Sequence, residues 1–203
     1  MTLVKVGKCT IRATQPGDAN YLAATAVSQS FQVTKASQTI SFGALSNQPY
    51  GTAPFTVSAT ASSGLAVKFA STTQTICTVS GNTVTLVKVG KCTIHASQAG
   101  NVDYAAATPV NQSFQVAKAH QTITFGALAN QPLGTAPFAV SATASSALPV
   151  SFASTTPGVC TVSGNTVTLV ALGKCTIHAT QAGNVDYLAA TPVNQSFQVT
   201  RAN

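Results

Sequence analysis

Short runs of alternating apolar and polar residues fill most of this chain. Alternation with a period of two predicts a β-strand with one buried face, because successive side chains point to opposite sides of a strand. Groups of turn-forming residues separate the runs, as at Asn47-Gln48-Pro49, Ser62-Ser63-Gly64 and Ser80-Gly81-Asn82. Between residues 38 and 120 the apolar positions are Ile40 and Phe42, then Phe55, Val57, Ala59 and Ala61, then Val67 and Phe69, Cys77 and Val79, Val84 and Leu86, Cys92, Ile94 and Ala96, and Phe114 and Val116. This pattern predicts about seven short strands in that stretch.

The same pattern occurs twice without gaps, in residues 38–120 and in residues 121–203. Only 17 of the 83 paired positions differ, and the string CTVSGNTVTLV recurs unchanged from Cys77 and from Cys160. Single-sheet solenoids have repeats of about 20–45 residues, which is much shorter than this period. Each copy is therefore predicted to be a domain of its own, made of two sheets packed face to face.

A third copy is present in part, because residues 1–37 align with residues 84–120. The string TLVKVGKCTI is identical from Thr2 and from Thr85. We predict that residues 1–37 are the C-terminal half of a truncated repeat. Met1 stands where the full copies have valine, as a GTG codon read as a start codon would produce, and we expect the reading frame to extend upstream. Half a sandwich cannot bury its apolar face, so we expect weak protection of residues 1–37 from hydrogen exchange.

The segments between copies are short and contain no glycine. They are Thr34-Lys35-Ala36-Ser37 and Ala117-Lys118-Ala119-His120. Glycine-rich linkers are flexible, so this composition predicts limited freedom between neighbouring copies.

Charged residues make up only 6% of the chain, against roughly 25% in an ordinary soluble protein. Glu and Trp are absent, and the carboxylate side chains are those of Asp18, Asp103 and Asp186. The net charge of +7 reflects missing acids rather than a run of Lys and Arg, so we expect no nucleic-acid partner. No apolar stretch reaches the roughly 18 residues of a membrane span, so we expect no membrane insertion of this segment.

The five cysteines follow the repeat. Two pairs are separated by the same interval and lie on the inward phase of their strands: Cys77 with Cys92, and Cys160 with Cys175. We predict a disulfide within each pair, and Cys9, which matches the second member, is predicted to be unpaired because of the truncation. Buried free thiols and a metal site are the alternatives. A zinc site needs four ligands, and His95, one residue past Ile94, faces away from the cysteines.

The sequence offers few groups for catalysis. Each full copy has one carboxylate, Asp103 or Asp186, in the string AGNVDY, whereas glycoside hydrolysis needs a facing pair. We interpret these aspartates as turn formers that bind their own backbone, with a calcium ligand as the alternative. Tyr104 and Tyr187 follow them and, with the equivalent Tyr21, are interpreted as packing residues, with sugar stacking as the alternative. We therefore predict no catalytic residue, no cofactor and no metal site, and we expect that the chain is not an enzyme.

The string VCTVSGNTVTLVALGKCTIHATQAGNVDY resembles the second half of bacterial immunoglobulin-like repeats, and QTITFGALANQPLGTAPFAVSATASSALPVSFAS resembles the matching first half. The resemblance covers the two full copies and the partial one. It implies an all-β fold of tandem immunoglobulin-like β-sandwich domains. It also implies the tandem repeats of large surface or secreted proteins, and it transfers no binding residue.

These observations favour a non-catalytic structural stalk or spacer in a bacterial cell-surface or secreted, adhesin-like protein. Near identity between neighbours suits repeats that serve for reach, because each copy needs only to fold. The alternative is a module that binds a glycan, a wall polymer or a protein through avidity. The expected partners are the neighbouring repeats of the same chain and, in the alternative, a host or cell-wall glycan or protein. The expected location is extracellular or at the cell surface.

Overall fold

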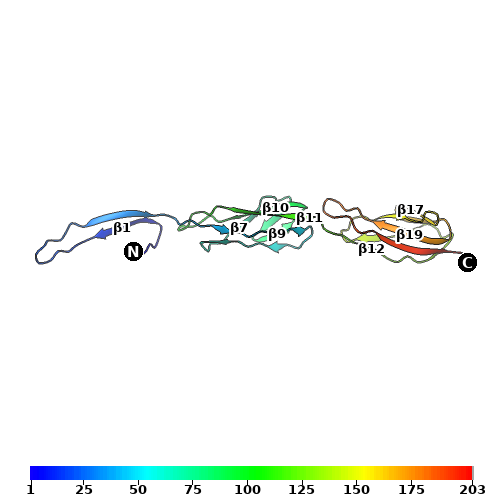
Figure 1. The fold of residues 1–203 in the computed structure, drawn as a ribbon, viewed down its shortest axis with the longest axis horizontal. Coiled ribbons are helices and arrows are strands. Elements are labelled where there is room, and N and C mark those ends of the chain that lie inside the picture. The colour runs from blue at the N-terminus through cyan, green and yellow to red at the C-terminus, as the bar shows by residue number, and fades with distance from the viewer. Residues whose placement is uncertain (203) are drawn as a thin grey trace. The chain divides into compact units, whose positions relative to one another are not determined.

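The structure is a computed structural model that describes residues 1–202 and contains only β-strands as regular elements in that range. Figure 1 shows the strands as arrows and shows no coiled ribbon. This confirms the all-β prediction. Within residues 1–202 there is no helix that is long and apolar enough to cross a membrane.

The chain divides into two compact units. Unit 1 comprises Met1–Ser46, Ala53–Thr85 and Lys91–Phe114. Unit 2 comprises Asn47–Thr52, Leu86–Gly90 and Gln115–Asn203. The division into domains 1–37, 38–120 and 121–203 stays a prediction.

Unit 1 begins with a hairpin of β1 (Gly7–Ala13) and β2 (Val27–Val33), which form a two-stranded antiparallel sheet. The register pairs Cys9 with Phe31 and Ile11 with Gln29. This hairpin lies in the partial copy of the repeat, and its further contacts are described below.

The strands of residues 38–120 are β3 (Ile40–Ser41), β4 (Gln48–Pro49), β5 (Phe55–Thr56), β6 (Thr60–Ala61), β7 (Lys68–Ser71), β8 (Cys77–Ser80), β9 (Thr83–Leu86), β10 (Gly90–Ser97) and β11 (Val110–Ala117). They form sheets in the orders β4-β11-β10-β7, β5-β9-β8 and β3-β6. The longest strands, β10 and β11, have eight residues each.

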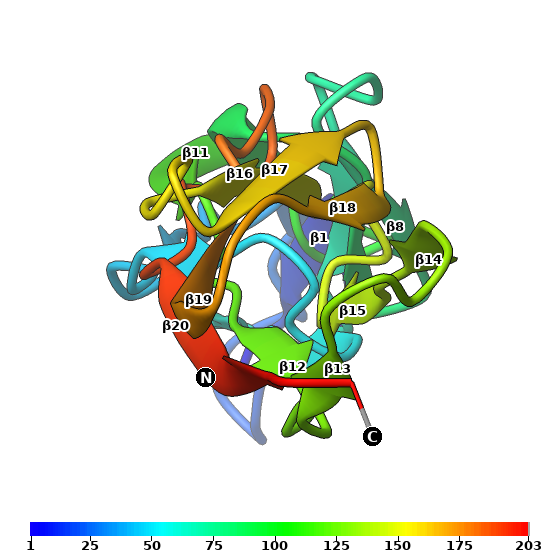
Figure 2. The same cartoon turned by 90° about the vertical axis from the view of Figure 1, so that its right-hand side faces the viewer.

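The strands of residues 121–203 are β12 (Ile123–Phe125), β13 (Gln131–Pro132), β14 (Phe138–Ala139), β15 (Ala142–Ala144), β16 (Ser151–Ser154), β17 (Cys160–Ser163), β18 (Thr166–Leu169), β19 (Gly173–Thr180) and β20 (Val193–Thr200). Their sheets repeat the same orders: β13-β20-β19-β16, β14-β18-β17 and β12-β15. Figure 2 shows β19 beside β20 and β17 beside β18.

The core of unit 2 is filled from both larger sheets and the small pair of strands. Its buried members are Ile123, Phe125, Val140, Cys160, Val167, Cys175, Ile177, Ala179, Ala190, Phe197 and Val199. Each strand contributes alternate residues, as in β19, where Cys175, Ile177 and Ala179 are fully buried. Two sheets that bury one face of each strand against the other make a β-sandwich, which is the fold class that the sequence predicts.

Two details of the strand prediction are wrong. The run from Phe55 to Ala61 is not one strand: Phe55 pairs with Val84, whereas Ala61 pairs with Ile40. The run changes sheets midway, as strands at the corners of sandwiches do.

The second detail concerns the segment read as a turn at Asn47-Gln48-Pro49. Gln48 and Pro49 form β4, which pairs in parallel with Val116 and Ala117. Because β4 is the outer strand of its sheet, proline is tolerated there although it lacks an N–H group. Each full copy consequently has more and shorter strands than the alternation predicts.

Candidate functional site

The disulfides are the most deeply buried chemical feature of the fold. The structure links Cys77 to Cys92 and Cys160 to Cys175, with a Cα–Cα distance of 5.7 Å in each pair. All four sulfur-bearing residues have no exposed surface. Each bond joins strands of different sheets, β8 to β10 and β17 to β19, so it fastens the two layers of a sandwich together.

Cys9 is the cysteine of residues 1–202 that lies outside a disulfide, and it is half-buried. It lies on β1 opposite Phe31 of β2. The corresponding pairing in the last copy joins Cys175 and Phe197, so Cys9 has the strand position of a bonded cysteine. The structure thus buries the four bonded cysteines on the inward phase of their strands, and Cys9 occupies the equivalent register position of β1.

The turn that contains AGNVDY is organised by its asparagine. Asn184 Oδ1 accepts hydrogen bonds from the amides of Asp186 at 2.8 Å and Tyr187 at 2.9 Å. Gly183 precedes it with a positive φ of 77°, and a Cβ there would collide with the Tyr187 carbonyl oxygen. The interpretation of Asp186 as the turn former is therefore wrong, because a side chain two residues earlier already satisfies these amides.

The equivalent turns repeat this arrangement. Asn101 Oδ1 accepts from the amides of Asp103 and Tyr104, both at 2.8 Å. In the partial copy Asp18 takes the place of the asparagine and accepts from the amides of Asn20 and Tyr21 at 2.8 and 2.9 Å. An acceptor oxygen at this position is what the three copies share.

Asp186 has a different partner inside unit 2. Its Oδ1 accepts a hydrogen bond from the Val89 amide at 3.2 Å. Next to it, the Tyr187 ring meets the Tyr50 ring edge to face, with centroids 5.6 Å apart. Tyr50 is replaced by Leu133 in the following copy, so this aromatic contact is not a general property of the repeat.

The segment that leads into each full copy is fixed by backbone contacts. Ala119 forms an isolated bridge with Tyr187, and the Lys118 Nζ donates to the Asn184 carbonyl at 2.6 Å. In unit 1 the equivalent bridge joins Ala36 to Tyr104. The segments read as linkers are thus partly integrated into the turn of the copy that follows them.

The structure contains a network of buried glutamines that the sequence pattern did not predict. Gln121 Nε2 donates to Gln181 Oε1 at 2.7 Å and to the Leu188 carbonyl at 2.6 Å, and Ser146 donates to Gln121 Oε1. Gln181 Oε1 also accepts from the Gly183 amide. The network ties the first strand region to the AGNVDY turn without using a charge.

The same network recurs in the previous copy, where Gln38 Nε2 donates to Gln98 Oε1 at 2.8 Å and to the Ala105 carbonyl at 2.7 Å. Both Gln38 and Gln121 are 6% exposed. A glutamine two residues before an apolar strand, recurring in each full copy, is the signal that could have revealed this network. Buried polar groups need partners, and an uncharged amide is satisfied at lower desolvation cost than a carboxylate.

The two strand histidines lie at the surface side of their sheet. His95 Nδ1 is 2.8 Å from Asn111 Oδ1, and His178 Nδ1 is 2.6 Å from Asn194 Oδ1. Among residues 1–202 no group of three or more His, Cys, Asp or Glu side chains is placed to hold a metal ion.

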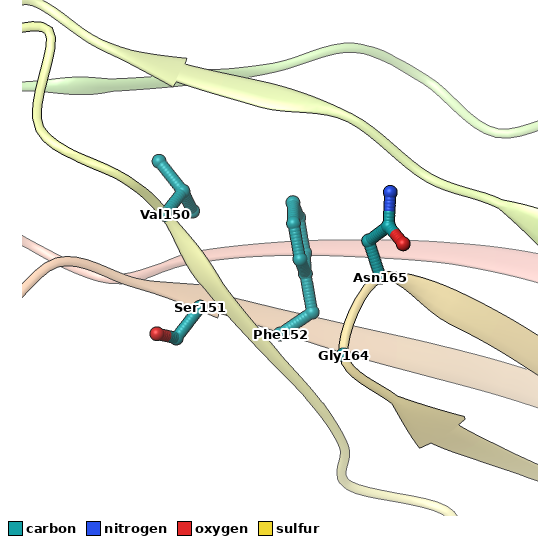
Figure 3. A pocket seen from close by; sticks show the side chains of 5 residues that line it. All are labelled: Val150, Ser151, Phe152, Gly164 and Asn165. Carbon is teal, nitrogen blue, oxygen red and sulfur yellow. The ribbon is translucent and has the colours of Figure 1, made fainter.

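An open hollow of about 400 Å³ lies on unit 2 beside β16. Its lining consists of Val150, Ser151, Phe152, Gly164 and Asn165. Figure 3 shows Val150 and Phe152 projecting to one side of the strand, with Asn165 of the β17–β18 turn next to the Phe152 ring. None of these lining side chains is ionisable, so the hollow offers apolar contact and an amide rather than acid–base chemistry.

The fold and the disulfide-linked core together define the class: the sequence repeats of this chain form an all-β protein in which sheets pack as β-sandwiches around buried disulfides. No protein-family model and no curated protein matches it.

Several solved structures resemble the chain at low identity. The EC22–24 fragment of mouse cadherin-23 is 14% identical, with a TM-score of 0.37, over 98% of this chain and 76% of that chain. Domains 1–6 of the surface-layer protein SbsC are 12% identical, with a TM-score of 0.33, over 97% of this chain and 32% of that chain. A C-terminal fragment of intimin, in complex with the intimin-binding domain of its receptor, is 19% identical, with a TM-score of 0.27, over 83% and 65%. The class therefore rests on the sheets and the core described above.

Proposed function

We propose that this chain is a set of non-catalytic structural repeats, a stalk or spacer, of a bacterial cell-surface or secreted, adhesin-like protein. In this role the repeats hold a functional part of the protein at a distance and carry tension between the two ends of the chain. The residues that matter are those that keep each copy closed, and no exposed group is required to be reactive.

The observation that carries this proposal is that the segment before each full copy makes the same backbone and lysine contacts with that copy. Ala36 bridges to Tyr104, and Ala119 bridges to Tyr187. Lys35 Nζ donates to the Asn101 carbonyl at 2.6 Å, and Lys118 Nζ repeats this contact with Asn184. Because the entry contacts are part of the repeat itself, any number of copies can be added in series without a new linker.

The buried disulfides support an extracellular or cell-surface location. Disulfides form and persist in oxidising compartments and are rare where thiol-reducing systems operate. Each bond closes a loop with a sequence separation of 15, so tension applied to the ends of a copy cannot extend that loop. This property suits a segment under mechanical load.

Single-molecule pulling on the full chain tests the load-bearing role. We expect two unfolding events, one for each full copy. Each step should lengthen by about 45 Å after reduction, because the chain between the two cysteines then extends at roughly 3.3–3.6 Å per residue over a separation of 15 instead of being held at a Cα–Cα distance of 5.7 Å. A Cys160→Ala, Cys175→Ala variant should show one long step and one short step without reductant. Extension without discrete events in the oxidised chain would contradict the proposal.

Binding measurements separate the stalk from its alternative, a module that recognises a glycan, a wall polymer or a protein. The net charge of +7 gives an anionic wall polymer as the first probe. A stalk shows at most weak binding that disappears as salt is raised, because scattered surface charges are screened. Saturable binding that persists at about 0.5 M salt, where screening is nearly complete, would favour the binding module instead.

A further inference from the structure

Two hydroxyl groups contact each disulfide, and both lie against the same sulfur. In the last copy, Ser154 Oγ is 3.4 Å and Thr156 Oγ1 is 3.7 Å from the Sγ of Cys160. A disulfide sulfur carries no proton and is a weak acceptor, so the hydroxyls are the donors. Within residues 1–202 no hydroxyl makes such a contact with the Sγ of Cys175, so the two sulfurs of the bond have different surroundings.

The first full copy has the same arrangement. Ser71 Oγ is 3.4 Å and Thr73 Oγ1 is 3.7 Å from the Sγ of Cys77. The three residues between Thr73 and Cys77 all differ from their counterparts at positions 157–159, whereas the serine and the threonine are the same in both copies. The contact with sulfur therefore depends on the two hydroxyl positions and not on the turn residues between them and the cysteine.

Backbone amides fix the direction of the hydroxyl protons. Ser154 Oγ accepts a hydrogen bond from the Thr156 amide at 3.1 Å, and Thr156 Oγ1 accepts one from the Thr176 amide at 2.9 Å. A hydroxyl whose oxygen accepts from an amide is free to turn its own proton toward a second acceptor, here the sulfur. The Cys160 amide also donates to the Thr156 carbonyl at 3.0 Å, so a local turn holds both hydroxyls next to Cys160.

We propose that the hydroxyl pair makes the disulfide directional: Cys175 is the site at which a low-molecular-weight thiol is attached, and Cys160 is the thiolate that leaves. Hydrogen bonds stabilise a thiolate, and the more stable thiolate is the better leaving group in thiol–disulfide exchange. Cys92 and Cys77 have the corresponding roles in the first full copy. All four residues are fully buried, so exchange takes place after a copy opens locally.

The exchange is balanced without an oxidant. With glutathione as the thiol, its thiolate attacks the Sγ of Cys175. The bond between glutathione and Cys175 forms, the bond between Cys175 and Cys160 breaks, and the electron pair leaves on the Cys160 sulfur beside the two hydroxyls. Closing of the disulfide is the reverse step, in which the Cys160 thiolate attacks Cys175 and releases the glutathione thiolate.

The test uses the full chain and glutathione. Samples are taken before the adducts equilibrate, free thiols are alkylated, and non-reducing peptide mapping locates the glutathione. We expect chains with glutathione on Cys175 and an alkyl group on Cys160 to exceed the reverse species about 5-fold or more, because two hydroxyl donors stabilise one leaving thiolate. The first full copy should show the same preference, for Cys92 over Cys77.

Variants of the last copy are compared with the first full copy of the same molecule as an internal reference. Ser154→Ala with Thr156→Val removes both donors, and the adduct ratio in the last copy should fall to within about twofold of one, while the ratio in the first full copy stays unchanged. Thr155→Ala is the matched control and should keep the preference, because the Thr155 hydroxyl donates to the Thr176 carbonyl and not to a sulfur. Thr156→Ser retains a hydroxyl and should keep the preference as well.

Two further measurements keep the test decisive if the double variant does not fold. Ser154→Ala alone leaves the Thr156 hydroxyl in place and should lower the adduct ratio about twofold or more. The unmodified chain in concentrated guanidinium chloride should lose the preference, because the turn that holds the hydroxyls is then absent. A ratio near one in the folded chain, a ratio that Ser154→Ala leaves unchanged, or an equal preference in guanidinium chloride would each overturn the proposal.

Discussion

The disulfide of the last copy offers a prediction whose size follows from the structure. The perturbation is the double substitution Cys160→Ala, Cys175→Ala, which removes the bond and leaves the rest of the chain unchanged. The bond closes a loop with a sequence separation of 15, and its loss is expected to cost about 3 kcal/mol through the greater freedom of the unfolded chain. Both cysteines are fully buried, so the emptied volume adds to the loss.

For a domain of 60–100 residues, about 1 kcal/mol corresponds to a change in Tm of roughly 4–8 °C. The transition of the altered copy should therefore fall by roughly 12–24 °C. The copy that retains Cys77–Cys92 is an internal reference, so differential scanning calorimetry of the full chain should show one transition that moves and one that stays.

Two controls accompany the calorimetry of the double variant. Cys9→Ala removes a cysteine that lies outside a disulfide, and it should shift neither transition. Reduction of the unmodified chain should lower both transitions, because both copies then lose their cross-link. A shift of less than about 4 °C in the double variant, which corresponds to under about 1 kcal/mol, would refute the assignment of this bond as a major source of stability.

The remaining predictions concern packing, the buried amides and the backbone. Ile177→Ala should lower the free energy of unfolding of its copy by about 2–5 kcal/mol in urea titrations, whereas Ile11→Ala should leave both full copies unchanged, since Ile11 is exposed. Gln121→Leu should cost about 1–3 kcal/mol, because the Leu188 carbonyl loses its side-chain donor and the Ser146 hydroxyl loses its acceptor, while Gln198→Leu at an exposed position should cost less than about 0.5 kcal/mol by the same assay. Ala147→Gly should raise the Tm of its copy, because Ala147 has a positive φ of 60°; an unchanged or lower Tm would count against strain there.

Much of the fold was predictable because it is local or periodic. Alternation of apolar and polar residues identified most strands, since a half-buried strand shows a period of two in any context. The repeat of 83 residues predicted separate copies rather than a solenoid. The cysteine positions followed from the same alternation, because residues such as Cys175 and Ile177 lie on one phase of one strand.

Pairing between strands could not be read from the alternation. Phe55 and Ala61 share a phase but serve different sheets, and nothing in the local pattern marks the change of partner between them. The strand at Gln48-Pro49 is only two residues long, and its formation depends on the edge of β11 being available. Such pairings are decided by the three-dimensional arrangement of the sheets.

The partners of the polar side chains, like the strand pairings, could not be predicted from the sequence. The sequence by itself determined the composition, the repeats, the all-β class and the inward phase of the cysteines, because these depend on residue type and spacing alone. Only the tertiary structure decided that Asn184 rather than Asp186 organises its turn, and that Gln121 reaches Gln181 across 60 residues. Hydrogen bonds between distant residues depend on where the chain returns in space, and side-chain amides and carboxylates in a sequence do not reveal their partners.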